Sequence, residues 1–317
     1  MSASFTTLGI DVSKATLDVS TYPDVNAARV DYTERGRQEL LAYLKEWEPD
    51  LVVFEATGGL EIDLGCWLHE ADVPFVVVNP RHARDFAKAT GRLAKTDAID
   101  AHLLAFYGHA IRPEPRPMRD AQARFLNELV TRRRQLSDMI VAETNRWKQV
   151  RSKQMKKSIG SHLTILRDEQ AEIEEQIQAQ IKSDEQLKRD CAVLRSAPGV
   201  GPVLAITLLA QLPELGQLNR KEIAKLVGVA PLNRDSGTHR GKRSTWGGRA
   251  SVRQVLYMGA LAACRTCPAL KSFYERLCGN GKTKKVAVVA VMRKLLTALN
   301  AMLRDQKKWS SQMVLPH

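Results

Sequence analysis

The chain has 317 residues, of which 44% are hydrophobic and 26% are charged, and it carries a net charge of +13 with a sequence pI of about 9.6. This composition is typical of a soluble globular protein and excludes a disordered or fibrous chain. Because no segment has the roughly 18 uninterrupted apolar residues of a membrane span and no secretory signal is visible, we expect a cytoplasmic protein without a membrane partner. The five cysteines, an odd number, fit a reducing compartment.

The charge is unevenly distributed along the chain. Residues 1–100 carry a net charge of −7, residues 101–219 carry +4 and residues 220–317 carry +16. An acidic first third followed by a strongly basic last third is typical of a metal-dependent catalytic module joined to a module that grips a polyanion. The charge pattern therefore predicts nucleic-acid binding.

The first third of the chain alternates strand and helix patterns. The predicted strands are 7–12, 17–21, 28–32, 51–55 and 74–79, and the predicted helices are 36–47 and 61–71. Hairpin strands followed by strand-helix-strand crossovers predict a mixed sheet flanked by helices. The order of Asp11 on the first strand, Glu55 on the fourth and a later helix with two further acids resembles that of the ribonuclease H-like fold.

Four acidic residues in this region have the arrangement of a metal site. Asp11 and Glu55 each stand at the end of a buried strand, and Asp97 and Asp100 share one face of a predicted helix. Carboxylates gathered from three elements repel one another unless a cation lies among them. The pattern predicts a Mg²⁺ site that activates oxygens in phosphoryl transfer. For each acid taken alone, an ordinary helix cap or a solvated side chain is the alternative.

The middle of the chain is predicted to be a linker followed by long helices. Residues 112–117 contain three alternating prolines, which cannot continue a helix. Residues 120–195 contain no proline and one glycine, with apolar residues spaced by three, four or seven. This spacing predicts a helical hairpin or coiled coil that packs on itself or on a partner subunit. Its basic stretch from Arg132 to Lys157 is an additional candidate for phosphate contact.

The last third is predicted to be mainly helical, with helices at 203–212, 220–227, 252–263 and 286–303. The turn before the first of these helices resembles a helix-hairpin-helix element, in which Gly199 and Gly201 let backbone amides approach a phosphate. An ordinary turn between helices explains these glycines almost as well.

A basic loop at residues 230–243 contains Ser236. Cations around a hydroxyl group suit attack on a phosphodiester, but most serines in such loops have no catalytic role. The predicted phosphate contacts in and after the loop are Arg240, Lys242, Arg243, Arg249 and Arg253.

Seven motifs occur in the order found in one family. They are GIDVSK (9–14), EATG (55–58), NP (79–80), KTDAIDA (95–101), PGVG (198–201), GVAP (228–231) and DSG (235–237). Over roughly residues 7–305 the chain resembles the DEDD-type insertion-sequence transposases, which are also called bridge-RNA-guided recombinases. The resemblance implies an α/β RuvC-like domain at 1–112, an α-helical coiled-coil insertion at 113–190 and a mainly α transposase domain at 191–317.

The resemblance also implies roles for individual residues. Asp11, Glu55, Asp97 and Asp100 correspond to the family's Mg²⁺-binding tetrad, and Ser236 corresponds to its nucleophilic serine. We therefore expect Ser236 to attack DNA and form a phosphoserine, with the acids of one subunit meeting the serine of another. The implied partners are DNA at the element ends and target, a structured guide RNA, and further copies of the chain in a dimer or tetramer. The expected location is the bacterial cytoplasm, at the nucleoid when the enzyme is active.

Two other functions are compatible with the same residues. A RuvC-like junction-resolving nuclease would use the four acids and water, without Ser236. A non-catalytic nucleic-acid-binding protein would keep the fold without using the acids. The intact set of four acids and a serine favours the recombinase.

Overall fold

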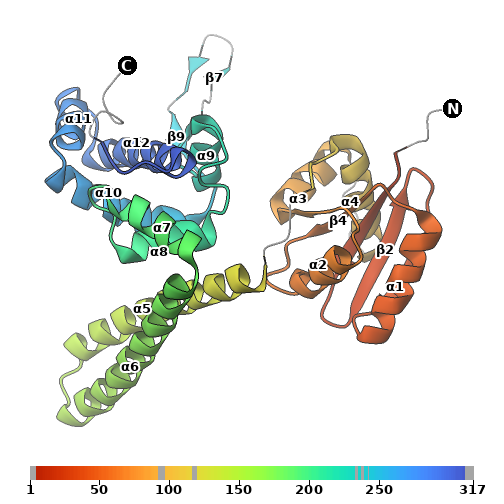
Figure 1. Ribbon diagram of the computed structural model, residues 1–317, viewed down its shortest axis with the longest axis horizontal. Helices are drawn as coiled ribbons and strands as arrows, with labels where there is room; N and C mark the ends of the chain where they lie inside the picture. Colours follow the sequence, from red (N-terminus) through yellow and green to blue (C-terminus); the bar gives the residue numbers. More distant parts are fainter. Residues whose placement is uncertain are drawn as a thin grey trace. The chain divides into compact units, whose positions relative to one another are not determined.

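The computed structural model describes residues 5–91, 97–115, 120–232, 235–236, 239–241 and 243–310. The chain divides into two compact units, residues 1–119 and 120–317. The first unit is mixed α/β and the second is mostly helical (Figure 1). The long helices that follow the linker belong to the same compact unit as the C-terminal helices, and the division into 1–112, 113–190 and 191–317 stays a prediction.

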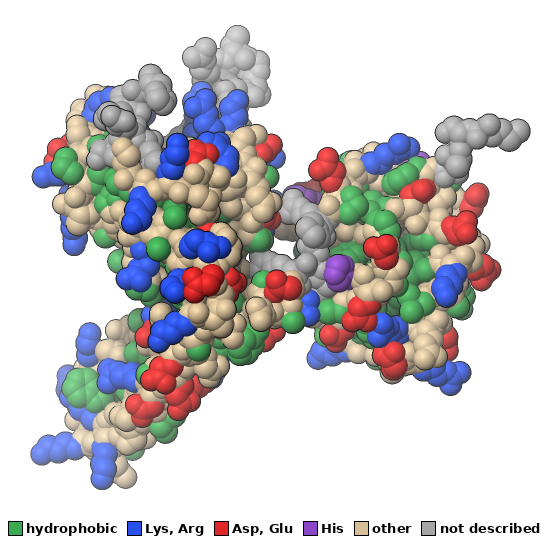
Figure 2. All heavy atoms as spheres, viewed as in Figure 1, with side chains coloured by type: hydrophobic (Ala, Val, Ile, Leu, Met, Phe, Trp, Pro, Cys, Tyr) green, Lys and Arg blue, Asp and Glu red, His purple; other side chains and the backbone are tan. Residues whose placement is uncertain are grey.

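The two units differ in charge. Residues 1–119 carry a net charge of −5 and residues 120–317 carry +18. Figure 2 shows acidic side chains spread over the first unit and Lys and Arg side chains over much of the second. The asymmetry read from the sequence therefore coincides with the structural division.

Five strands form the sheet of the first unit, in the order β3-β2-β1-β4-β5. β1 (Thr7–Val12) pairs antiparallel with β2 (Thr16–Tyr22) and parallel with β4 (Leu51–Glu55). β3 (Ala27–Asp31) lies at one edge and β5 (Phe75–Val78) at the other. The mixed sheet predicted from the sequence is confirmed.

Helices cover both faces of this sheet (Figure 1). α1 (Glu34–Trp47) and α2 (Glu61–Glu70) bury their apolar side chains with alternate residues of the strands on one face. α3 (Pro80–Ala89) and α4 (Asp97–Ile111) pack on the opposite face. Asp11 and Glu55 lie at the carboxyl ends of β1 and β4 and are partly buried.

Gly9 lets α4 lie directly on β1. A Cβ atom built at Gly9 would lie 2.0 Å from the carbonyl oxygen of Ala101 and 2.4 Å from the backbone nitrogen of Ala105. Neither backbone atom can move without displacing the helix. The glycine in the first sequence motif is therefore required for close packing of a helix against a strand.

Gly9→Ala is expected to destabilise the first unit by about 1–3 kcal/mol, because the methyl group forces α4 away from the sheet. Gly160→Ala is the matched control, since a Cβ at Gly160 meets nothing within 4 Å and the residue lies inside a helix. The control should stabilise the protein by about 0.5–1 kcal/mol. Denaturant unfolding measures both changes. Equal stability of the two variants would contradict this account of Gly9.

The second unit begins with a long helical hairpin. α5 (Ala121–Gln149) and α6 (Lys153–Ser183) pack along each other, with Leu163 and Leu166 buried between them. Ile177, near the other end of α6, packs with the start of α5 and with helices of the C-terminal bundle. The predicted helical hairpin is confirmed, whereas a coiled coil stays a prediction.

The C-terminal helices form the largest buried cluster of the chain's described residues. They are α7 (Glu185–Arg195), α8 (Pro202–Gln211), α9 (Arg220–Val227), α10 (Ala250–Thr266), α11 (Pro268–Gly279) and α12 (Lys284–Asp305). In the described ranges, α12 alone has the length and apolar composition of a membrane span, but 61% of its apolar window is buried in this cluster. Its composition is that of a central core helix.

Candidate active site

Asp11 lies near the carboxyl end of β1, on the side of the sheet covered by α4. Side chains alternate between the two faces along a strand. Leu8 and Ile10 pack with α1 and α2, whereas Gly9 lies against α4. Asp11, two residues after Gly9, therefore shares the α4 side.

Glu55 ends β4 on the same side. The last register pair between β1 and β4 joins Ile10 to Phe54, so Asp11 and Glu55 each follow one residue later on neighbouring parallel strands. Val53 is on the α4 side, because its Cγ2 would lie 2.7 Å from a Cβ placed on Gly108 of that helix. Glu55, two residues further on, faces the same way.

α4 runs antiparallel to β1 across this face. Thr7 Oγ1 donates a hydrogen bond to the carbonyl oxygen of Ala105 at 2.6 Å, and Gly9 lies against Ala101, one turn earlier in the helix. Later residues of β1 therefore meet earlier residues of α4, and the first turn of α4 lies at the end of β1 that carries Asp11.

That first turn contains the other two predicted ligands. Asp97 is the first residue of α4, although its side chain lies outside the described residues, and the partly exposed Asp100 follows three residues later. The partial positive charge at a helix N-terminus favours carboxylates nearby. The backbone therefore brings Asp11, Glu55, Asp97 and Asp100 to one end of the first unit.

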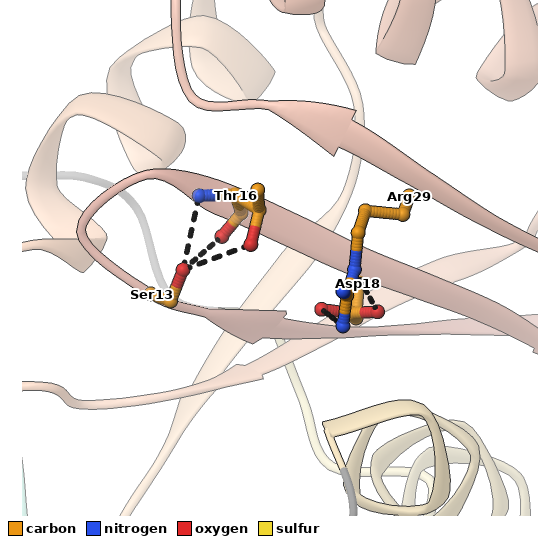
Figure 3. Close-up of polar contacts among 4 residues, drawn as sticks. All are labelled: Ser13, Thr16, Asp18 and Arg29. Atoms are coloured by element: carbon orange, nitrogen blue, oxygen red, sulfur yellow. Dashed lines mark hydrogen bonds and ion pairs between the residues drawn. The ribbon is translucent and has the colours of Figure 1, made fainter.

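A fifth acid, missed in the sequence, lies in the same row. Asp18 of β2 is the register partner of Asp11, and Arg29 of β3 is the register partner of Asp18. The Asp18 carboxylate accepts from Arg29 Nε at 2.9 Å and from Arg29 Nη2 at 3.0 Å (Figure 3). Its side chain is 8% exposed, against 57% for Arg29. The bidentate pair compensates a buried charge that would otherwise repel Asp11.

The turn between β1 and β2 is fixed by a second set of contacts drawn in Figure 3. Ser13 Oγ accepts from the backbone nitrogen of Thr16 at 2.9 Å and donates to the carbonyl oxygen of Thr16 at 2.8 Å. This serine follows Asp11 by two residues. Its hydroxyl group therefore holds the tight turn that sets Asp11 opposite Asp18.

The donor chemistry of this corner fits a hard divalent cation, since its acids offer carboxylate oxygens from two strands and one helix. Among the described residues, however, no group of three or more His, Cys, Asp or Glu side chains is arranged to hold a metal ion. The side chain of Asp97 is outside that set. The structure places the four acids at one end of the first unit by their backbone positions, and it does not show their side chains closed around a metal ion.

Glu61 orders the loop that follows Glu55. Its Oε2 accepts hydrogen bonds from the backbone nitrogen and the hydroxyl group of Thr57, both at 3.0 Å, and from the backbone nitrogen of Gly59 at 2.8 Å. Burial by itself would raise the pKa of Glu61, but hydrogen bonds from its own backbone and from Gly59 and Thr57 hold that pKa below its ordinary value of 4.5. Glu61 is thus a positioning residue that sequence reasoning overlooked.

Glu61→Gln is expected to destabilise the first unit by roughly 1 kcal/mol at pH 7, because the ionised acceptor is replaced by a neutral one. A carboxyl group with a depressed pKa in the folded state contributes stability above the unfolded pKa, and loses it as pH falls through the folded pKa. The gap between wild type and variant should therefore narrow as the pH falls below the ordinary pKa of 4.5 and through the lower folded pKa. Denaturant unfolding at pH 7 and pH 3.5 tests this, with the exposed Glu46→Gln as control. A gap of the same size at both pH values would contradict the assignment.

Ser236 lies in the second unit, in a short strand pair rather than an open loop. β7 (Asp235–Ser236) pairs antiparallel with β8 (His239–Arg240), and His239 is the register partner of Ser236. β6 (Pro231–Leu232) and β9 (Ser244–Thr245) flank them as a second pair. The side chains of Ser236 and Arg240 and the whole of Lys242 lie outside the described residues, whereas Arg243 is exposed.

The two glycines of the predicted helix-hairpin-helix turn have different physical roles. Gly199 has φ +77°, and a Cβ there would lie 2.2 Å from the carbonyl oxygen of Gly259, so the fold itself requires this glycine. Gly201 begins α8 with φ −84°, and a Cβ there meets nothing within 4 Å. Both line a pocket of about 650 Å³ between α5, α8 and α10. No steric contact requires glycine at position 201, and phosphate contact by Gly201 stays a prediction.

Arg249 and Arg253 already have internal partners. Arg249 binds both carboxylate oxygens of Glu214, at 2.5 and 2.6 Å, and the carbonyl oxygen of Gln211 at 3.0 Å. Arg253 donates to the carbonyl oxygens of Val227 and Gly247. Both guanidinium groups hold the base of the segment that carries Ser236. Their assignment as phosphate contacts stays a prediction without support from these contacts.

Comparisons with known proteins agree with this arrangement. Residues 8–152 match a family model for the DEDD transposase domain of IS110, and residues 191–275 match the transposase family IS116/IS110/IS902. The chain is 27% identical to the pilin gene-inverting protein of Moraxella bovis over 97% of this chain and 98% of that protein. It is 30% identical to an uncharacterised IS110 protein of Streptomyces coelicolor over 49% of this chain and 38% of that protein.

A solved structure, the Holliday junction resolvase of fowlpox virus, aligns with 33% of this chain and 99% of its own at 12% identity, with a TM-score of 0.25, which is too low to define a fold. The family matches and the gene-inverting relative define the class: the protein is a DNA transposase or recombinase. More particularly, the chain carries the DEDD and C-terminal transposase domains of the IS110 family.

Proposed function

We propose that this enzyme is an RNA-guided, Mg²⁺-dependent recombinase that cuts and rejoins DNA through a phosphoserine at Ser236. The observation that carries the proposal is the convergence of the acids. Register pairing brings Asp11 and Glu55 to adjacent strand ends on the α4 side, and α4 begins there with Asp97 and Asp100.

The sheet order supports a ribonuclease H-like, RuvC-type fold for the first unit. The antiparallel strands β1, β2 and β3 are followed by two crossovers that place β4 and β5 parallel to β1. In that fold the acids occupy the carboxyl end of the first strand, its parallel neighbour and a later helix. Mg²⁺ held by Asp11, Glu55, Asp97 and Asp100 would polarise the scissile phosphate and stabilise charge on the leaving oxygen.

Ser236 then acts as the nucleophile. Its Oγ forms a bond to phosphorus while the ester bond to one deoxyribose oxygen breaks, and the proton lost by the serine hydroxyl is balanced by the proton that the leaving oxygen gains to become a hydroxyl group. Attack by a deoxyribose hydroxyl of the second DNA on the phosphoserine restores the serine and completes the exchange. Each step forms one phosphate ester bond and breaks another, so no external energy source is needed.

The four acids and Ser236 belong to different compact units. The proposal includes an assembly, a dimer or tetramer, in which the acids of one subunit serve the serine of another. A guide RNA that pairs with both DNAs supplies sequence selection, and the charge of +18 on residues 120–317 suits contacts with RNA and DNA backbones.

The separation of acids and serine also keeps a second function open, hydrolysis of DNA junctions by the first unit with water as nucleophile. The deciding experiment incubates the protein with Mg²⁺, the RNA transcribed from beside its gene, and labelled element-end DNA. A protein-DNA adduct that resists denaturant and requires both the RNA and Mg²⁺ is expected. Cleavage without any adduct would favour hydrolysis, and an adduct formed equally well without RNA would remove the guidance step.

A further inference from the structure

The free end of the α5–α6 hairpin is strongly basic. We call residues 144–160 the hairpin tip. They contain six Lys and Arg residues and no Asp or Glu. Figure 2 shows these cations gathered at the end of the hairpin. Such a density of one charge is unfavourable unless a partner neutralises it.

Arginines nearer the body of the hairpin are neutralised within the chain. Arg132 pairs with Glu169 at 2.6 Å and Arg133 pairs with Glu174 at 2.7 Å. At the tip, Arg146 pairs with Glu143 and Lys156 lies over a tryptophan ring. Four further tip cations are exposed, and their side chains form no ion pair or hydrogen bond with any described residue: Lys148, Arg151, Lys153 and Lys157.

The tip cations on α6 are also placed against the helix dipole. Lys153 and Lys157 lie in the first turns of α6, which begins without an acidic residue. The partial positive charge of a helix N-terminus disfavours cations there. The sequence thus places positive charge where helix stability opposes it, which a merely solvated surface does not require.

Apolar side chains accompany the cations. Trp147 is 41% exposed and Met155 is 46% exposed. Lys156 Nζ lies 5.0 Å from the centroid of the Trp147 ring. Exposed aromatic and apolar groups beside lysines suit a ligand that combines phosphates with sugar and base surfaces.

The hairpin carries this surface well away from the rest of the second unit. Val130 of α5 packs against Ile206 of α8 at the base of the hairpin. Val130 and Trp147 lie in one continuous helix, so at 1.5 Å per residue the tip is about 25 Å beyond that contact. This distance corresponds to about seven base pairs of duplex DNA.

We propose that the hairpin tip binds the backbone of duplex DNA outside the segment that is cut and exchanged. The inference rests on the proposed function, which supplies DNA as the partner. It assigns a sequence-independent grip to Lys148, Arg151, Lys153 and Lys157, with Trp147 and Met155 in contact with the sugars. The grip lengthens the DNA footprint and contributes no base selection.

The test measures binding to element-end duplexes in EDTA with the Ser236→Ala protein, so that no chemistry occurs. One duplex has only the minimal site, and a second adds about 15 base pairs of arbitrary sequence on each side. The neutralised variant replaces Lys148, Arg151, Lys153 and Lys157 with Gln. The matched control exchanges Lys for Arg and Arg for Lys at the same four positions and so keeps the charge.

The unaltered tip and the charge-keeping control are expected to bind the longer duplex at least about tenfold more tightly than the shorter one. The neutralised variant should lose this gain, and its slope of log affinity against log salt should fall by about 2–4, at about 0.9 per lost phosphate contact. Its thermal stability should change little, because removing Lys153 from the start of α6 favours that helix, whereas removing Lys148 from the last turn of α5 disfavours the other. Weaker binding together with little change in stability is the combination that the inference requires.

Four outcomes would overturn the inference. The neutralised variant could keep the length-dependent gain, or it could lose affinity equally for both duplexes. A gain confined to duplex RNA of the same length would make RNA the ligand. A changed subunit number in light scattering, with the gain intact, would make the tip a contact between copies of the chain. None of these measurements depends on a protein-DNA adduct. The serine chemistry can therefore be disproved while DNA binding by the hairpin tip is confirmed, and DNA binding by the tip can be disproved while the serine chemistry is confirmed.

Discussion

Asp11→Asn is expected to lower Mg²⁺-dependent cleavage and exchange of DNA by about 100- to 1,000-fold. Asparagine keeps the shape of the side chain but removes the charge and one anionic oxygen that a divalent cation would use. Losses of this size are typical when one group that stabilises transition-state charge is removed. The rate of strand cleavage at saturating Mg²⁺ measures the effect.

Asp11→Asn should not lower the free energy of unfolding. Measuring that free energy therefore distinguishes a loss of catalysis from a loss of folded protein. Asp11 lies beside Glu55 on the neighbouring strand, so removing its charge relieves repulsion between these two carboxylates, whereas Asp18 is already paired with Arg29. We expect an unchanged or higher free energy of unfolding without metal, and loss of the added stability that Mg²⁺ gives the wild type. Asp63→Asn is the control, because Asp63 is exposed on α2, which packs on the opposite face of the sheet. Full activity of Asp11→Asn would remove the acids from the mechanism.

The strands and most helices of the first unit were predictable because their apolar residues alternate clearly. The strand Leu51–Glu55 was predicted with its observed bounds, and β1 likewise. The helix α3 was missed even though Asn79 caps it and Pro80 occupies its first position, a common start signal for a helix. Asn79 and Pro80 belong to a family motif and also start a helix, so one dipeptide has both roles.

The position of Asp18 beside Asp11 could have been predicted from the sequence. The predicted strands 7–12 and 17–21 leave only residues 13–16 for the turn between them, and a hairpin with a turn of this length fixes the register that places Asp11 opposite Asp18. The further step to Arg29 requires knowing how β3 pairs with β2, which the residues of the intervening loop do not fix. Glu61 was less accessible still, because its role depends on a loop folding back over two glycines.

The helical part shows a different limit. Residues 120–195 had the pattern of one continuous helical region, but Asp184 ends α6 and caps α7 by accepting from the backbone nitrogens of Gln186 and Leu187. α11 escaped notice because Pro268 at its first position reads equally well as a terminator of the preceding helix. Asp184 and Cys267 each lie between the end of one helix and the start of the next. The regular spacing of apolar residues does not reveal a helix boundary of one residue.

Long-range pairing also decides which basic residues are available to bind DNA. Arg249 and Arg253 stood next to the serine segment in the sequence and were grouped with Arg240, Lys242 and Arg243. The partners that engage the first two come from α8, α9 and the loops around them, among them Glu214, 35 residues away. A count of cations near a motif therefore overstates the number that can meet a phosphate.

Ser236→Ala is expected to abolish the covalent protein-DNA adduct and strand exchange completely, because alanine has no oxygen to bond to phosphorus. DNA binding in EDTA should be unchanged. Ser244→Ala is the matched control, since Ser244 is exposed in β9 of the same segment and has no proposed role. Adduct formation is measured by gel mobility of labelled DNA in denaturant, and exchange by the joined product.

The residual activity of Ser236→Ala discriminates between the two chemistries. If the acids need the serine, the variant neither cuts nor joins DNA. If it cuts at the wild-type rate and leaves free ends, the first unit alone activates water, and the enzyme is a nuclease whose second unit serves binding. Combining Ser236→Ala protein with Asp11→Asn protein then tests the division of labour. Acids from one chain and serine from the other can restore exchange only if the two residues meet across a subunit boundary, because neither variant carries both.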